Sequence, residues 1–197
     1  MGLFDFLNKV PKVNEINGSF GEWLATICSK IIPDSYLIHD VLIDGAEGFT
    51  SQIDLLIISN KGINVVEVKT FTNAKIYGNT DKLNWNYYTH GKKYEIYSPL
   101  KQNKKHIDYL KRFLCDFGEV PCFSIITMIC EDIKISGEIN KEDCLDTAFC
   151  TSIPAMHKAI KKITDDKPVV FDDGKMRAIY EFIKNVDYIN NFNQKNI

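Results

Sequence analysis

Two carboxylates and a lysine lie close together in apolar segments of this chain. Asp54 interrupts the apolar segment 51–59, and thirteen residues later Glu67 and Lys69 alternate with valines. Residues i and i+2 of a strand share a face, so Glu67 and Lys69 are expected to point the same way. Charged groups inside an apolar strand are costly to bury unless something compensates them. A divalent metal ion on Asp54 and Glu67, with Lys69 beside a scissile phosphate, would compensate them.

Hydrolysis of a phosphodiester bond needs an activated water molecule and neutralised charge on the phosphate. Mg²⁺ or Mn²⁺ held by carboxylates supplies both. We expect Asp54 and Glu67 to be the main ligands, and the carbonyl of Val68 to be a further one because it adjoins Glu67. Lys69 would orient or deprotonate the water, or stabilise the pentacovalent phosphate. This set of residues therefore predicts metal-dependent cleavage of a phosphodiester.

Two further polar residues lie in the first turns of predicted helices. Glu22 follows Ser19 at the spacing of a capping box, so it either caps its helix or reaches the metal through a water molecule. Gln102 follows Ser98 and Pro99, which predict an N-cap and a first helical residue. An amide at that position can contact a phosphate or the attacking water. A solvated surface glutamine is the alternative.

The helix predicted after Pro99 is the most basic segment of the chain. Its cations either track a nucleic-acid backbone or form the solvated face of an amphipathic helix. The candidate nucleic-acid-binding residues are Lys101, Lys104, Lys105, Lys111 and Arg112. His106 lies four residues after Gln102 on one helix face, but the histidine spacing predicts no site and we assign His106 no role.

Aromatic residues cluster between the carboxylate strands and the basic helix. Rings among lysines can stack on bases, but half-buried sheet residues are the more common case, and we expect a structural role for these. The cluster comprises Trp85, Tyr87, Tyr88, Tyr94 and Tyr97.

Hydrophobic periodicity predicts the elements that position these residues. The expected order is a helix from Ser19, strands at 36–43, 52–59 and 63–70, short strands at 74–77, 82–88 and 93–97, a helix from Pro99 and a buried strand at 122–130. A short strand at 148–151 and helices at 153–163 and 175–190 follow. This order predicts one α/β domain with a central mixed sheet flanked by helices. We expect a lead-in at 1–17, a core at 18–135 and a C-terminal helical extension of the same domain at 136–197.

Composition excludes several classes of protein. The 45% apolar and 25% charged fractions are those of a globular domain, and a net charge of −2 argues against a basic coat while allowing a local basic face. The apolar run at 125–130 is too short to span a bilayer. The N-terminus shows no secretory pattern, so we expect a cytoplasmic protein with six reduced cysteines. Residues 1–17 are expected to pack on the domain or fray, rather than to contact a membrane.

The motifs resemble the nuclease-related domain (NERD) family of the PD-(D/E)xK superfamily. The resemblance covers roughly residues 18–115 and the strand near 122–130, and it rests on Gly21-Glu22, Ser51–Asp54, Gly62, Glu67–Lys69, Trp85 and Pro99–Gln102. It implies a restriction-endonuclease-like core, a divalent metal, DNA as substrate, and a site made of Glu22, Asp54, Glu67, Lys69 and Gln102. Ile53 replaces the proline of the superfamily motif, as is usual in this family, and no motif is recognised after about residue 135.

Three functions are compatible with these observations. The first is a Mg²⁺- or Mn²⁺-dependent nuclease acting on DNA, in DNA processing or anti-phage defence. The second is a catalytically silent module on the same fold that binds nucleic acid or a partner protein. The third is a small interaction protein that uses an amphipathic N-terminus and the C-terminal helices to form a homo-oligomer or to bind a partner protein. Intact Asp54, Glu67 and Lys69 favour the nuclease, because a protein that only binds does not need all three.

Overall fold

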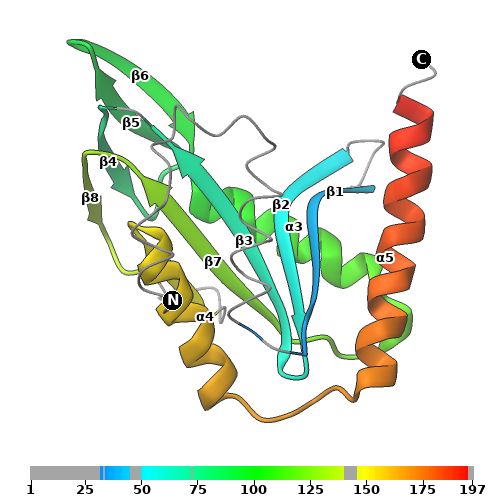
Figure 1. The fold of residues 1–197 in the computed structure, drawn as a ribbon. Helices are drawn as coiled ribbons and strands as arrows, with labels where there is room; N and C mark the ends of the chain where they lie inside the picture. The colour runs from blue at the N-terminus through cyan, green and yellow to red at the C-terminus, as the bar shows by residue number, and fades with distance from the viewer. Residues whose placement is uncertain (1–31, 33, 45–49, 72, 140–145, 195–197) are drawn as a thin grey trace, which may run out of the picture.

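The structure is a computed structural model, which describes residues 32, 34–44, 50–71, 73–139 and 146–194. Its central sheet has five strands in the order β1-β2-β3-β7-β9 (Figure 1). The strands are β1 (Tyr36–Asp44), β2 (Thr50–Ser59), β3 (Gly62–Thr70), β7 (Cys122–Ile129) and β9 (Thr147–Cys150). The first three form an antiparallel meander, and β7 and β9 extend it in parallel from β3. The predicted α/β fold with a central mixed sheet is confirmed.

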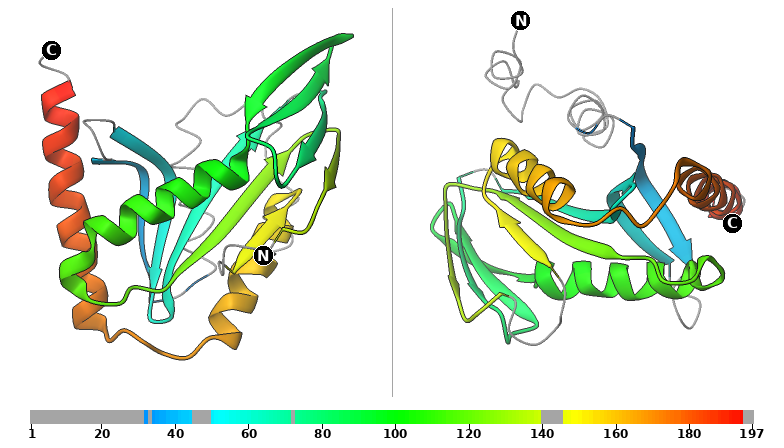
Figure 2. Two further views of the ribbon diagram at one scale, coloured as in Figure 1. Left: turned by 180° about the vertical axis from the view of Figure 1, so that it is seen from behind. Right: turned by 90° about the horizontal axis from the view of Figure 1, so that it is seen from below.

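Helices cover both faces of this sheet (Figure 2). Helix α3 (Pro99–Phe113) packs on one face with Leu56 and Ile107 in the core, and α4 (Ile153–Asp166) packs on the other with Val66 and Met156. Helix α5 (Asp173–Gln194) lies along β1 and is longer than predicted at both ends. A short 3₁₀ turn, η3 (Cys115–Phe117), follows α3. In the described part of the chain, no helix is long and apolar enough to cross a membrane.

A second sheet of four strands, here called the wing, extends beyond the ends of β3 and β7 (Figures 1 and 2). Its order is β6-β5-β4-β8, with β4 (Lys75–Asn79), β5 (Asn84–Thr89), β6 (Lys92–Tyr97) and β8 (Asp132–Ser136). Trp85 anchors the wing: it is 1% exposed, packs with Ile126 and Met128, and donates a 2.9 Å hydrogen bond from Nε1 to the carbonyl of Asn79. Trp85 is therefore a core residue, as expected for this ring.

The tight turn between β2 and β3 fixes β3 against β7. Gly62 has a φ of 132°, which only glycine adopts readily. A Cβ at this position would lie 2.5 Å from the carbonyl oxygen of Pro121, at the start of β7. The next residue, Ile63, donates a 2.9 Å hydrogen bond to that same oxygen. The turn thus sets the parallel register that carries Glu67 to its position.

Candidate active site

Strands β1 and β2 bend where Asp40 faces Asp54. The register is the same on both sides of this position, but the pair between Asp40 and Asp54 is not formed, and Asp40 has a φ of 52°. The direction in which alternate side chains of β2 point changes at this position. Ile53 packs in the core on the α3 side of the sheet, whereas Leu55 packs in the core on the α4 side. Residues i and i+2 of a regular strand would share one face. Such an irregularity re-aims a side chain, and here it frees Asp54 from the ladder.

The carboxylate of Asp54 takes the place of a strand partner for β3. Pairing between β2 and β3 ends at Leu55 and Val66, and the N–H of Val68 instead donates to Oδ2 of Asp54 at 2.7 Å. Burial and, second to it, the negative charge of Glu67 together raise the pKa of Asp54 to about 6. The hydrogen bond from Val68 opposes this rise. Two carboxylates are therefore held near enough to repel each other.

Glu67 is the most buried charged group of the site, with no exposed surface. Its Oε1 lies 2.5 Å from Nζ of Lys69, whose side chain is 31% exposed, and its Oε2 lies 3.3 Å from Nε2 of His106. Glu67 and Lys69 thus share a face, as the strand period predicts. These contacts are ion pairs in distance only, since neither oxygen accepts a well-aligned hydrogen bond from the described residues. A buried carboxylate left in this condition has capacity for a cation.

A polar network leads from Glu67 back to β2. Nδ1 of His106 lies 2.6 Å from Oγ of Ser51, and Nε2 of His106 lies 3.3 Å from Nε2 of Gln102. A neutral ring protonated on Nε2 would accept from Ser51 and donate toward Glu67. Ser51 and His106 were not predicted as site residues. The helical spacing between Gln102 and His106 was the available signal, but it does not reveal the contact with β2.

The first turns of α3 are fixed at this end of the sheet. Ser98 is the N-cap, as predicted: its Oγ accepts from the N–H of Lys101, and its carbonyl accepts from the N–H of Gln102 at 2.9 Å. Asn103 is fully buried, and its Nδ2 lies 2.9 Å from both the carbonyl of Val65 and Oγ of Ser124. These bonds join the helix to β3 and β7, and they hold Gln102 beside the carboxylate strands.

The five predicted nucleic-acid-binding residues lie along α3: Lys101, Lys104, Lys105, Lys111 and Arg112. Several of them have partners within the chain. Nζ of Lys104 lies 3.6 Å from the carboxylate of Asp108, and Nζ of Lys105 lies 5.0 Å from the ring centroid of Tyr97. Lys111 and Arg112 lie in the last turn, at the far end of the helix from Gln102. Of the five, Lys101, Lys104 and Lys105 therefore lie toward the end of the helix that carries Gln102.

The fifth predicted site residue, Glu22, lies outside the described residues together with its helix. Asp54, Glu67, Lys69 and Gln102 are brought to one end of the sheet, with the backbone of Val68 among them. Among the described side chains, no group of three or more His, Cys, Asp or Glu residues is arranged to hold a metal ion. The described site thus offers two carboxylates and a backbone carbonyl.

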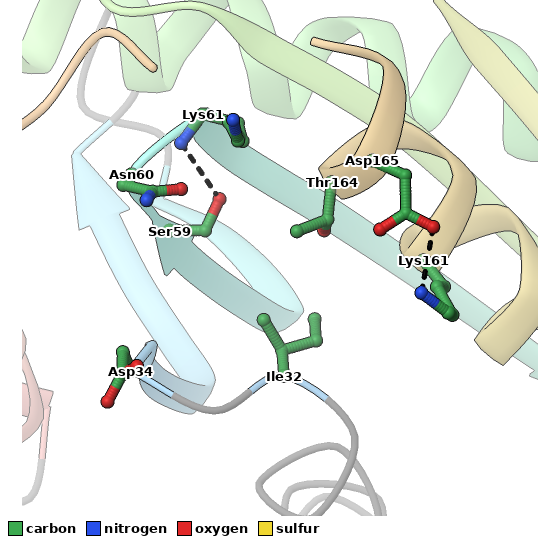
Figure 3. Close-up of a pocket in the computed structure, with 8 residues that line it drawn as sticks. All are labelled: Ile32, Asp34, Ser59, Asn60, Lys61, Lys161, Thr164 and Asp165. Carbon is green, nitrogen blue, oxygen red and sulfur yellow. Dashed lines mark hydrogen bonds and ion pairs between the residues drawn. The ribbon is translucent and has the colours of Figure 1, made fainter. Parts of the chain in front are cut away.

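A separate pocket lies near the turn between β2 and β3, at the other end of β2 from Ser51 (Figure 3). It is lined by Ile32, Asp34, Ser59, Asn60, Lys61, Lys161, Thr164 and Asp165. Lys161 and Asp165 pair with each other at 2.8 Å, and Oγ of Ser59 accepts from the backbone N–H of Lys61 at 3.3 Å. These groups contribute nothing to the carboxylate site.

Comparison with known proteins shows the family of this chain. The profile of the nuclease-related domain matches residues 18–129. The chain belongs to the nuclease-related domain family. This family is part of the restriction-endonuclease-like superfamily, and the α/β fold of the chain is consistent with the core of that superfamily. The matched residues include every site residue discussed above.

The names of two similar proteins state no activity. The uncharacterized protein pXO1-01 of Bacillus anthracis is 34% identical over 123 residues, which cover 60% of this chain. The match spans 57% of that relative's own length. The crystal structure of the protein of unknown function AF1548 is 12% identical with a TM-score of 0.42, and the match covers 85% of this chain and 96% of that one.

Proposed function

We propose that this protein is a Mg²⁺- or Mn²⁺-dependent nuclease that hydrolyses phosphodiester bonds of DNA. The observation that carries the proposal is the fully buried carboxylate of Glu67, which lies beside Lys69 and repels Asp54. A structural ion pair between Glu67 and Lys69 does not explain the second carboxylate, that of the half-buried Asp54. A cation explains both, and membership of the nuclease-related domain family supports phosphodiester chemistry.

The donor set fits a hard divalent cation. Asp54, Glu67 and the carbonyl of Val68 would hold the ion, and oxygen ligands of this kind suit Mg²⁺ and Mn²⁺. Glu22 is proposed as a further ligand. Burial and the charge of Glu67 raise the pKa of Asp54, and a bound cation would favour its ionised form. When bound, the ion would supply Lewis-acid activation of water and neutralise charge on the phosphate.

The chain's own residues would do the remaining work. Lys69 is partly exposed, so its ammonium group can reach solvent and a phosphate oxygen while it stays beside Glu67. There it would orient the attacking water or stabilise negative charge that develops on the phosphate. Gln102 would donate to the water or the phosphate from the first turns of α3. Ser51 and His106 would hold the Glu67 carboxylate in place.

Substrate binding would use the exposed basic side of α3. Lysine and arginine side chains that contact phosphates give affinity without sequence preference, together with a strong dependence on salt. Lys101 and Lys105 lie on the first two turns of this helix, at the end that also carries Gln102. They would therefore guide the DNA backbone toward the site.

Cleavage of plasmid and linear DNA in Mg²⁺ or Mn²⁺ tests the proposal. We expect the wild-type protein to cut, and Asp54→Ala and Lys69→Ala to lose on the order of 10² or more in rate. Lys61→Ala is the matched control, because Lys61 lies in the turn at the other end of β3. Salt-sensitive DNA binding without any turnover would instead identify a silent binding module.

A further inference from the structure

We propose that one face of the wing binds unpaired bases of single-stranded DNA next to the candidate active site. This inference rests on the proposed function and names the form of its substrate. Three rings, here called the ring row, lie in sequence on this face: Phe71, Tyr87 and Tyr94. Their centroids are separated by 5.0 Å from Phe71 to Tyr87 and by 5.1 Å from Tyr87 to Tyr94.

The ring row begins at the site. Phe71 follows Lys69 by two residues, so the strand period places both on one face of β3. The N–H of Phe71 donates to the carbonyl of Ile129 at 2.8 Å, which continues the pairing between β3 and β7 past the last strand residue. A chain whose phosphate lies at Lys69 would therefore have its neighbouring nucleotides beside these rings.

The outer end of the ring row is exposed, so a nucleic-acid base can stack on it. Tyr87 and Tyr94 are cross-strand partners on β5 and β6, and their planes are inclined by only 20°. Tyr87 packs partly into the core beside Trp85, whereas Tyr94 is 42% exposed. An exposed ring stacked on a supported one presents a flat surface to a base, and bases stack on such platforms whatever their sequence.

Charge on the same hairpin complements a DNA backbone. Lys92 precedes Tyr94 by two residues on β6, so both side chains share one face, and Lys92 is exposed at the tip of the hairpin. At the other end of the row, Lys69 lies two residues before Phe71 and shares its face of the strand. The row thus runs between two cations. Stacking of this kind requires bases that are not paired within a duplex, which is why we assign single-stranded DNA.

The opposite face of the wing provides a matched control. Tyr88 is also 42% exposed and lies on the same hairpin, but it pairs with Lys93 rather than with Tyr94. Its ring meets Tyr77 edge-on, with centroids 5.6 Å apart and planes at 89°, so these rings form no stacked platform. Replacing Tyr88 removes an equally exposed ring and leaves the ring row intact.

The test is fluorescence anisotropy in EDTA with a labelled 20-nucleotide single strand of mixed sequence and with its blunt duplex. We expect Tyr94→Ala to weaken binding of the single strand at least about fivefold and binding of the duplex less than twofold. Tyr94→Phe, which keeps the ring, and Tyr88→Ala should both remain within about twofold of wild type. Circular dichroism checks that each variant is folded.

The inference is overturned if Tyr94→Ala binds the single strand as wild type does, if the duplex loses as much affinity, or if Tyr88→Ala has the same effect. Failure of the proposed function looks different. Tyr94-dependent binding by a protein that cuts no DNA would support the ring row and contradict the nuclease. If cleavage requires Asp54 but binding of the single strand does not depend on Tyr94, the nuclease is supported and the ring row is contradicted.

Discussion

The imidazole of His106 lies 3.3 Å from the carboxylate of Glu67, which has no exposed surface. His106 belongs to α3 and Glu67 to β3, so this contact joins the helix to the strand that carries the candidate metal ligand. Ser51 of β2 contacts the other ring nitrogen at 2.6 Å. We therefore propose that His106 is a positioning residue, which orients the carboxylate of Glu67.

Replacing His106 should affect both stability and metal binding. His106→Ala removes the ring that Oε2 of Glu67 and Oγ of Ser51 contact, so we expect a loss of about 1–3 kcal/mol in the free energy of unfolding. We also expect Mn²⁺ to bind at least several-fold more weakly, measured by calorimetry at a temperature where the variant is folded. His90→Asn is the control, because His90 is exposed in a turn with a φ of 51° that asparagine accepts. Unchanged Mn²⁺ affinity in His106→Ala would leave His106 with a purely structural role.

Asp54 should make the metal-free protein less stable at neutral pH. Its pKa is raised from 3.8 to about 6, so the native state holds the proton more tightly than the unfolded state does. The stability from this group is present below pH 3.8 and is lost as the pH rises through 6. In EDTA at pH 7.5, Asp54→Asn should be more stable than wild type by on the order of 2 kcal/mol. The two should be nearly equal only below about pH 3.8, as urea denaturation would show. A variant less stable at both pH values would refute this.

Affinity for Mn²⁺ should fall as the pH drops below 6. The ion must displace the proton of Asp54, whose pKa is about 6. Relative to pH 7.5, we expect the dissociation constant to rise about fourfold at pH 5.5 and about tenfold at pH 5.0. Calorimetric titrations at these pH values make the measurement. Equal constants at pH 7.5 and 5.0 would show that Asp54 does not bind the ion.

The basic side of α3 should determine how DNA binding depends on salt. Lys101→Gln and Lys105→Gln should each reduce the slope of log K against log salt concentration by about one. The measurement is anisotropy in EDTA at several salt concentrations. Lys184→Gln, an exposed lysine on α5, should leave the slope unchanged. An unchanged slope in the two α3 variants would place the DNA elsewhere.

Local patterns in the sequence were enough to predict most of the fold. The strands of the central sheet are apolar runs bounded by turns, and the start of α3 has a strong signal in Ser98 and Pro99, so both were placed within a few residues. Strand β8 was missed because its five residues contain only two apolar ones, Ile133 and Ile135. It forms by pairing with β4, as in the match of Asp132 with Lys75. Pairing at that separation leaves no local pattern.

The site likewise combines contacts that a local pattern predicts with contacts that depend on tertiary packing. The shared face of Glu67 and Lys69 follows from the strand period, and the approach of Asp54 follows from counting around the turn at Gly62. The contact of His106 with Ser51 joins residues 55 positions apart through the packing of α3 on the sheet. No spacing rule predicts such a contact. The bend at Asp40, which frees Asp54 from the ladder, also depends on tertiary packing.

The most direct test of the account is the rate of DNA cleavage as a function of Mn²⁺ concentration for wild type, Glu67→Gln and Glu119→Gln. Glu119 is an exposed carboxylate just before β7, at the opposite end of that strand from the site, and serves as the control. We predict that the wild-type rate rises to saturation with Mn²⁺ and stops in EDTA, that Glu119→Gln behaves as wild type, and that Glu67→Gln is slower by on the order of 10² at every concentration. Cleavage that persists in EDTA, or an equal rate in Glu67→Gln, would contradict the account.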